Sequence, residues 1–156
     1  MPRLSAGQLL AVGVIAFLAV SAVVDVLTSI GKVGTSSGPP KAQLGGKVDG
    51  LRMTVGRESR LTFDLFLGSG DAMSPTCIGA NLTPEFKVVK VTFLGSPGGR
   101  WQDDESCGGI LETGSTIPIV IYVIPQYPGD YSIRVRPKVH SETVGVGTGG
   151  TISVSS

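Results

Sequence analysis

The sequence predicts an all-β domain, an antiparallel β-sandwich, that follows a single N-terminal hydrophobic α-helix. Three observations lead to this expectation. From about residue 43 onward, apolar residues alternate with polar ones, which is the period of a strand with one buried face. Clusters of glycine, proline, serine and aspartate separate the alternating runs and are typical of turns. Before all of these, residues 4–24 form an uncharged, largely apolar run.

The alternating runs define the expected strands. Six or seven short strands without a helical stretch favour two packed antiparallel sheets, and about 110 residues are enough to bury one core between them. The run 117–124 is apolar on both faces, so we expect it to be central or to face a partner. The expected strands cover residues 51–55, 61–67, 89–93, 117–124, 131–135 and 152–154.

Parts of this region resemble extracellular immunoglobulin-like modules. Residues 58–70 look like the second strand of such modules, and residues 111–123 followed by 128–135 look like their later strands. In that family a glycine makes the turn, and a tyrosine, here Tyr131, can fill a corner with its hydroxyl bonded to the backbone. The resemblance covers about half of the chain. It implies an immunoglobulin-like architecture rather than a particular function.

Residues 1–30 are expected to form a transmembrane or filament-core helix. A helix of about 20 apolar residues crosses the hydrocarbon core of a bilayer. Asp25 is the single charge between Arg3 and Lys32, and it would then lie in the far headgroup layer. Residues 31–42 are rich in glycine, serine and proline and are expected to be a linker. Residues 43–156 are the expected extracytoplasmic sandwich domain.

Three fates of the N-terminal segment remain open. It is a permanent single-pass anchor, a secretory signal cleaved after Ala22, or a pilin-type leader cut after Gly7. All three place the rest of the chain outside the cytoplasm. The expected location is the cell membrane, with the C-terminal domain extracytoplasmic, or a cell-surface filament. The layout of one apolar helix, a linker and one sandwich is similar to that of archaeal pilins, archaellins and archaellum stator-type proteins. This resemblance implies that the helix anchors the sandwich or packs into a filament core.

Composition excludes several classes of function. The chain has 156 residues, of which 13 are lysine or arginine and 12 are aspartate or glutamate, so no basic excess exists to attract nucleic acid. A single histidine excludes Cys₂His₂ zinc and blue-copper sites, and two cysteines cannot hold a Cys₄ cluster. We therefore expect no cofactor and no metal.

The two cysteines, Cys77 and Cys107, both fall in expected connections between strands. Outside the cytoplasm the default state of such a pair is a disulfide, and free, packed cysteines are the alternative. The bridge would tie the loop of residues 71–84 to the loop of residues 95–109. On the chain-entropy model it would stabilise the fold by about 3–4 kcal/mol.

Loop residues and the doubly apolar strand supply the candidate surface sites. Asn81 fits the pattern for N-glycosylation, together with Leu82 and Thr83. Trp101 stands beside acidic residues and is either a contact site on a stapled loop or a cap on the end of the core. The candidate partner contacts are Trp101, Asp103, Asp104, Ile117, Ile119 and Tyr122.

Nothing in the sequence indicates a catalytic centre. His140 has no serine or aspartate arrangement around it, and no spacing fixes two carboxylates across a cleft. Arg134, Arg136 and Lys138 share one strand face and are expected to be solvated.

The sequence therefore predicts a non-enzymatic, membrane-anchored structural subunit of a cell-surface filament, motility or envelope assembly. Its expected partners are the membrane and other proteins or copies of itself, and not nucleic acid. The alternatives are an accessory subunit of a larger membrane complex or membrane-containing virion, and a secreted ligand-binding module with a cleaved signal peptide.

Overall fold

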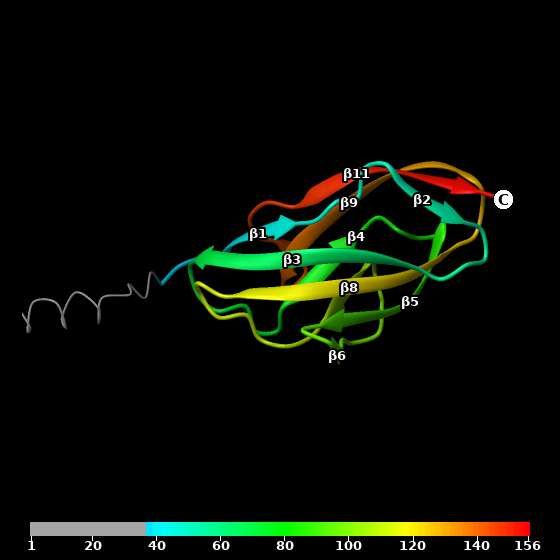
Figure 1. Cartoon of the computed structure of the whole chain (residues 1–156). Coiled ribbons are helices and arrows are strands. Elements are labelled where there is room, and N and C mark those ends of the chain that lie inside the picture. Colours follow the sequence, from blue (N-terminus) through cyan, green and yellow to red (C-terminus); the bar gives the residue numbers. More distant parts are fainter. Residues whose placement is uncertain (1–36) are drawn as a thin grey trace, which may run out of the picture. The chain divides into compact units, whose positions relative to one another are not determined.

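The computed structural model describes residues 37–156, and in this range the chain is all-β, as predicted (Figure 1). The first sheet has the strand order β1-β3-β8-β5-β6, and the second has the order β2-β11-β9-β4-β7, with β10 beside β9. The first sheet consists of β1 (Lys41–Gly45), β3 (Ser59–Ser69), β5 (Phe86–Phe93), β6 (Ser96–Pro97) and β8 (Thr116–Pro125). The second consists of β2 (Leu51–Thr54), β4 (Cys77–Ala80), β7 (Glu105–Cys107), β9 (Gly129–Val139), β10 (Glu142–Thr143) and β11 (Thr148–Ser155).

Alternating burial builds the core, as the sequence period predicts. In β3, Leu61, Phe63, Leu65 and Leu67 are buried, and the residues between them are exposed. Buried and exposed residues alternate in the same way along β9 and β11. Buried apolar residues of both sheets form one cluster, so the two sheets enclose a single hydrophobic core.

β8 is a central strand of the first sheet, between β3 and β5. Ile117 and Ile119 point into the core and are 7% and 0% exposed. They are therefore core residues rather than the partner contacts that the sequence suggested. The outward side of β8 carries Val120, Tyr122 and Ile124, which are half-buried.

β5 departs from the expected alternation because its pairing with β8 shifts register between Val88 and Lys90. A β-bulge adds one residue to a strand and changes which residues face inward. Val89 is consequently exposed, whereas Val91 and Phe93 are buried as expected. The far edge of β5 pairs with β6 only at its last two residues. A bulge and a lysine on such an edge discourage pairing with other chains.

Short strands account for most of the remaining differences. β4, β6, β7 and β10 have two to four residues, too few for a hydrophobic period to appear. β2 pairs with β11 in parallel, whereas the sequence predicted antiparallel pairing throughout. After β1 the chain crosses from the first sheet to the second. There β2 lies beside β11 and runs in the same direction. β1 begins at Lys41, within the range 31–42 that was predicted to be the linker.

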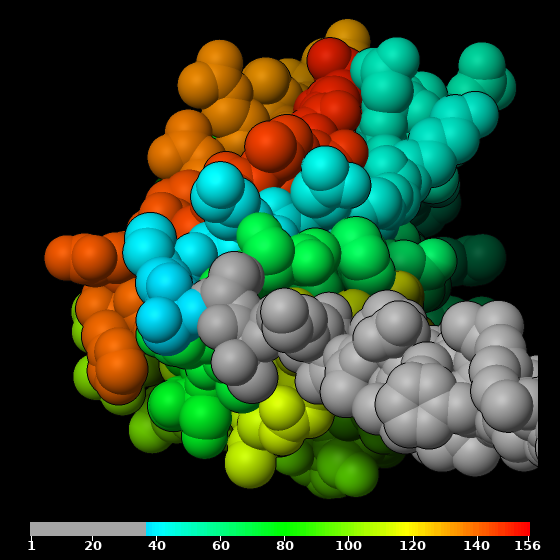
Figure 2. Space-filling model, turned by 90° about the vertical axis from the view of Figure 1, so that its left-hand side faces the viewer, coloured from blue at the N-terminus to red at the C-terminus, as the bar shows by residue number. Residues whose placement is uncertain are grey.

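The chain reaches the sandwich at one end and finishes at the other (Figure 1). Figure 2 looks onto the first end, where the orange segment that precedes β11 lies beside the cyan β1. The Leu44 amide donates to the carbonyl of Val146 at 2.9 Å, and the Val146 amide donates to the carbonyl of Ala42 at 2.8 Å. β1 is therefore held by β3 on one side and by Val146 on the other. β11 is paired on both sides within this chain, with β9 and β2.

The corner expected at Tyr131 is confirmed. Its hydroxyl lies 3.1 Å from the carbonyl oxygen of Tyr127 and 3.2 Å from that of Pro128. The Tyr131 ring meets the buried ring of Phe86 edge to face, with centroids 5.4 Å apart. These contacts fix the turn between β8 and β9 against the core.

The predictions for the first part of the sequence lie outside the described residues. They are the helix over residues 1–30, the linker up to residue 36, and the processing sites at Gly7 and Ala22. Within residues 37–156 no helix is long and apolar enough to cross a membrane.

Candidate functional site

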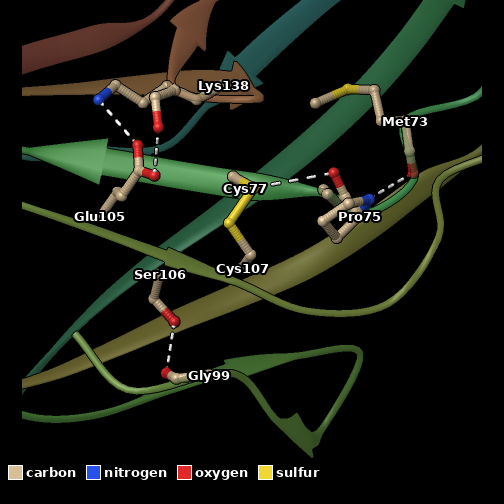
Figure 3. Close-up of a disulfide and its surroundings, with 10 residues drawn as sticks. Met73, Pro75, Cys77, Gly99, Glu105, Ser106, Cys107 and Lys138 are labelled. Carbon is tan, nitrogen blue, oxygen red and sulfur yellow. Dashed lines mark hydrogen bonds and ion pairs between the residues drawn. A yellow bond between two sulfur atoms is a disulfide. The ribbon is translucent and has the colours of Figure 1, made fainter. Parts of the chain in front are cut away.

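The disulfide expected from the sequence is confirmed and lies within the second sheet (Figure 3). Cys77 of β4 is directly opposite Cys107 of β7, with Cα atoms 4.0 Å apart. Both cysteines stand at strand ends rather than in connections. Ile78 and Cys77 are both buried, and because successive side chains alternate, Cys77 lies on the opposite side of β4 from Ile78, the side of its other register partner, Lys138.

A tight hairpin carries the acidic candidates Asp103 and Asp104. Both residues have left-handed backbone conformations, with φ of 51° and 58°, and hydrogen bonds between Gln102 and Glu105 close the turn. The side chain of Asp104 accepts a hydrogen bond from the hydroxyl of Thr83, and its carbonyl accepts the amide of Ala80 at 3.0 Å. Asp104 therefore fastens the hairpin to the segment around β4.

Asp103, by contrast, is exposed at the tip of this hairpin. The role of both aspartates as partner contacts stays a prediction. Within residues 37–156 the side chain of Asp104 is hydrogen-bonded, whereas that of Asp103 is not.

Trp101 is half-buried and packs against the hydrophobic core. Its indole Nε1 is buried and has no hydrogen-bond partner among residues 37–156. Beside it, a hollow of about 460 Å³ runs between residues 87–91 of β5 and residues 97–101. Trp101 thus packs against the core and also lines a surface hollow. Its role as a contact with a partner stays a prediction.

Tyr122 lies on the outward side of the first sheet, away from the disulfide. The ammonium of Lys90 sits 4.4 Å from the centre of its ring, a cation–π contact. The Tyr122 ring is therefore partly covered by a neighbouring strand of its own sheet, and the structure does not place it beside Trp101 in one site.

Glu105 of β7 forms an ion pair with Lys138 of β9, close to the disulfide (Figure 3). Its carboxylate accepts a hydrogen bond from the ammonium of Lys138 at 2.9 Å and another from the hydroxyl of Ser141 at 2.8 Å. The bond to Lys138 is the main cause that lowers the pKa of Glu105 below its ordinary value of 4.5, against the opposing effect of desolvation. The pair joins β7 to β9 and the turn that follows it.

We expect Glu105→Gln to remove an acid-sensitive part of the stability. Because the pKa of Glu105 is lower in the folded chain, its ionised form stabilises the fold above about 4.5, and this contribution is lost as the pH falls through the lowered pKa. The gap in unfolding free energy between wild type and Glu105→Gln should therefore shrink on acidification, measured by urea unfolding at several pH values. Glu112→Gln, at an exposed position, is the control and should show no such gap. A gap that stays constant across the acid range would contradict this account.

Asn81, the candidate glycosylation site, uses its side chain to extend the sheet. Its Nδ2 donates to the carbonyl of Ser132 at 2.9 Å, and its Oδ1 accepts the amide of Arg134 at 2.6 Å. A strand residue makes the same pair of bonds with its backbone, so the amide side chain continues the ladder where β4 ends. Nδ2 is also the atom to which a glycan attaches, and glycosylation stays a prediction.

The remaining titratable candidates do not converge. Asp71 and Glu112 are exposed in loops, and His140 is exposed in the turn after β9 with a φ of 48°. Across residues 37–156 no three histidine, cysteine, aspartate or glutamate side chains are grouped so that they could hold a metal ion.

Comparisons with known proteins give the fold. No protein-family model matches the chain, and no curated protein matches it in sequence. Among solved structures, AvmM, which catalyses macrocyclization in alchivemycin A biosynthesis, is similar with a TM-score of 0.50 at 10% identity, over 76% of this chain and 89% of that chain.

Two archaeal domains are also similar. A CARDB domain from Pyrococcus furiosus has a TM-score of 0.43 at 13% identity, over 76% of this chain and 91% of that chain. A non-cellulosomal cohesin from Archaeoglobus fulgidus has a TM-score of 0.44 at 11% identity, over 74% of this chain and 92% of that chain. At these identities the likeness concerns the fold alone. The two sheets of the structure, together with the likeness to AvmM, show that the chain carries a β-sandwich module.

Proposed function

We propose that this protein is a non-enzymatic subunit of a cell-surface assembly, in which the apolar N-terminal segment holds a disulfide-stapled β-sandwich outside the cytoplasm. The observation that carries the proposal is the disulfide. The only two cysteines of the chain are paired in adjacent strands, and disulfides of this kind persist in oxidising compartments. The uncharged run of residues 4–24 supplies the means of export and attachment.

The geometry of the sandwich suits such a role. Residues 37–41 approach one end of the domain, and the C-terminus lies at the opposite end (Figure 1). A domain attached through the first end presents its opposite end, with the turn at Tyr127, farthest from the point of attachment. Tyr127 is 61% exposed there, a large side chain available to a neighbouring subunit.

Assembly into a filament, a motility structure or an envelope layer is the finer part of the proposal. The layout of the sequence supports it. The proposal assigns no catalytic step to this chain, because its candidate residues make structural contacts. Any reaction in the assembly would belong to its partners.

Membrane attachment is tested with two single substitutions in the full chain. Val14→Asp puts a carboxylate at the middle of the apolar run, which costs about 2.5–3.5 kcal/mol in a membrane-spanning helix. Val23→Asp puts the same group beside Asp25, where the cost is small. After an alkaline wash of native membranes, wild type and Val23→Asp should stay in the pellet, and Val14→Asp should be depleted from it.

Release of the wild-type chain by the same wash would contradict the anchor. If the released chain lacked its first 22 residues, the protein would be a secreted module, and the assembly proposal would fail with it.

A further inference from the structure

The outward face of the second sheet carries two arginines without an acidic partner. Arg134, Arg136 and Lys138 alternate along β9 on the side away from the core. Lys138 is paired with Glu105, and no other ion pair occurs within residues 37–156. The guanidinium groups of Arg134 and Arg136 are therefore available to an anion.

Glycines of β4, of β11 and of the segment just before β11 make room for these long side chains. A Cβ atom on Gly149 would lie 3.5 Å from Cγ of Arg134, and one on Gly147 would lie 3.0 Å from Cγ of Arg136. On the other side of β9, a Cβ atom on Gly79 would lie 2.8 Å from Cδ of Lys138. The aliphatic stems of these side chains therefore pack against backbone that carries no side chain.

Two hollows flank the same two arginines. One, of about 330 Å³, lies toward β11, and the other, of about 540 Å³, lies toward β4. Arg134, Arg136 and Thr143 line both. Asp104 is the one carboxylate that lines either hollow, and it already accepts a hydrogen bond from Thr83. We call this surface the arginine trough, formed by Arg134, Arg136 and Thr143 with the glycines at 79, 147 and 149.

We propose that the arginine trough binds an acidic polysaccharide through its carboxylate or sulfate groups. A guanidinium presents a planar fork of donors that matches such groups with two hydrogen bonds. Arg134 and Arg136 are two residues apart on one strand face, about 7 Å along the strand, so they address two anionic groups in a row. Thr143 and Ser132 add hydroxyl groups for the sugar hydroxyls.

The surroundings favour a sugar chain over a peptide or a membrane. A peptide that adds as a strand needs an unpaired edge, but residues 135–138 of β9 pair with β4 on one side, and residues 129–135 pair with β11 on the other. A membrane surface calls for exposed apolar side chains beside the cations, and the two hollows are lined by glycine, polar and charged residues with only Ala80 and Val135 as apolar members. The trough lies wholly within residues 37–156, so it does not depend on the proposed membrane anchor.

The test is a titration of the full chain with three polysaccharides: heparin, which carries sulfate and carboxylate, polygalacturonate, which carries carboxylate alone, and neutral dextran. We expect binding to the two acidic chains and none to dextran. The double variant Arg134→Gln with Arg136→Gln should bind about 100-fold more weakly, because each charge-assisted pair is worth about tenfold in affinity. Arg57→Gln with Arg60→Gln removes the same charge from exposed positions elsewhere and should bind as wild type does.

A second variant keeps the arginines and blocks the trough. Thr143→Glu adds a carboxylate beside both hollows and should also abolish binding, with an unchanged melting temperature as the check on folding. Equal binding by wild type and the Arg134/Arg136 variant, or equal losses in that variant and the Arg57/Arg60 control, would overturn the site. Tighter binding of polyglutamate or of anionic phospholipid vesicles than of either polysaccharide would overturn the ligand class.

Discussion

Replacing both cysteines, Cys77→Ala with Cys107→Ala, is expected to lower the free energy of unfolding by about 3–4 kcal/mol. The bridge closes a loop that spans 30 positions of the sequence and joins β4 to β7 at the edge of the second sheet. β4 has four residues and β7 has three, so their backbone pairing alone is short. Without the bridge, the segment from Trp101 to Cys107 loses its covalent tie to the sheet. Urea unfolding of the full chain measures the difference.

The reduced wild type is the matched control for this prediction. Its unfolding free energy should equal that of the double variant, because both lack the same covalent constraint and the cysteines make no other strong contact. Equal stabilities of oxidised and reduced wild type would show that the bridge does not support the edge of the sheet.

Gly145→Ala is the second substitution with a large expected effect, a loss of at least about 3 kcal/mol. Gly145 has a φ of +77°, which L-residues adopt at a cost, and an added Cβ would overlap the carbonyl oxygen of Ala42. Ala42 is buried, and its carbonyl is the acceptor that holds Val146 against β1. The added methyl group therefore forces β1 away from the segment before β11. Hydrogen exchange at the amides of Leu44 and Val146 should accelerate, and the unfolding free energy should fall.

Gly114→Ala separates the two causes of this effect. Gly114 has nearly the same backbone conformation, with a φ of +81°, but an added Cβ would meet nothing within 4 Å. It should cost only the backbone penalty of about 1 kcal/mol. If the free energy of unfolding falls equally in the two variants, the close approach of Gly145 to Ala42 contributes nothing to stability. β1 would then be held by β3 alone.

The long strands were predictable from the sequence because their period is long enough to be recognised. β3 repeats the alternation from Leu61 to Leu67, and β9 repeats it from Tyr131 to Val135. β5 was predicted as a strand but with Val89 facing inward, because one bulge residue reverses the alternation without leaving a mark in the sequence. The parallel pairing of β2 with β11 depends on the path of the chain between sheets, which no local pattern encodes.

For the candidate residues, too, the sequence predicted some features and missed those that depend on the three-dimensional structure. Cysteine count and compartment predicted the bridge between Cys77 and Cys107, but not that they would face each other in adjacent strands. Ile117 and Ile119 looked like contact residues because β8 is apolar on both faces, and the core takes one of those faces.

The arginine trough shows what a linear reading misses. The strip of Arg134, Arg136 and Lys138 was visible in the sequence, but the glycines that flank it come from other strands. Gly79 is more than fifty positions away, and only the register of β4 with β9 places it there. Glycines aligned with basic residues across predicted strand pairs are the signal that could have marked the site.

The measurement that tests the central claim most directly is the intact mass of the protein purified from its native membranes, alkylated before and after reduction. The account predicts a chain that retains residues 8–24, takes up no alkylating reagent before reduction, and takes up two equivalents after it. Loss of the first seven residues alone would leave the apolar segment in place and indicate a pilin-type subunit. A chain that begins at residue 23, or one whose two thiols react without reduction, would contradict an anchored, disulfide-stapled surface subunit.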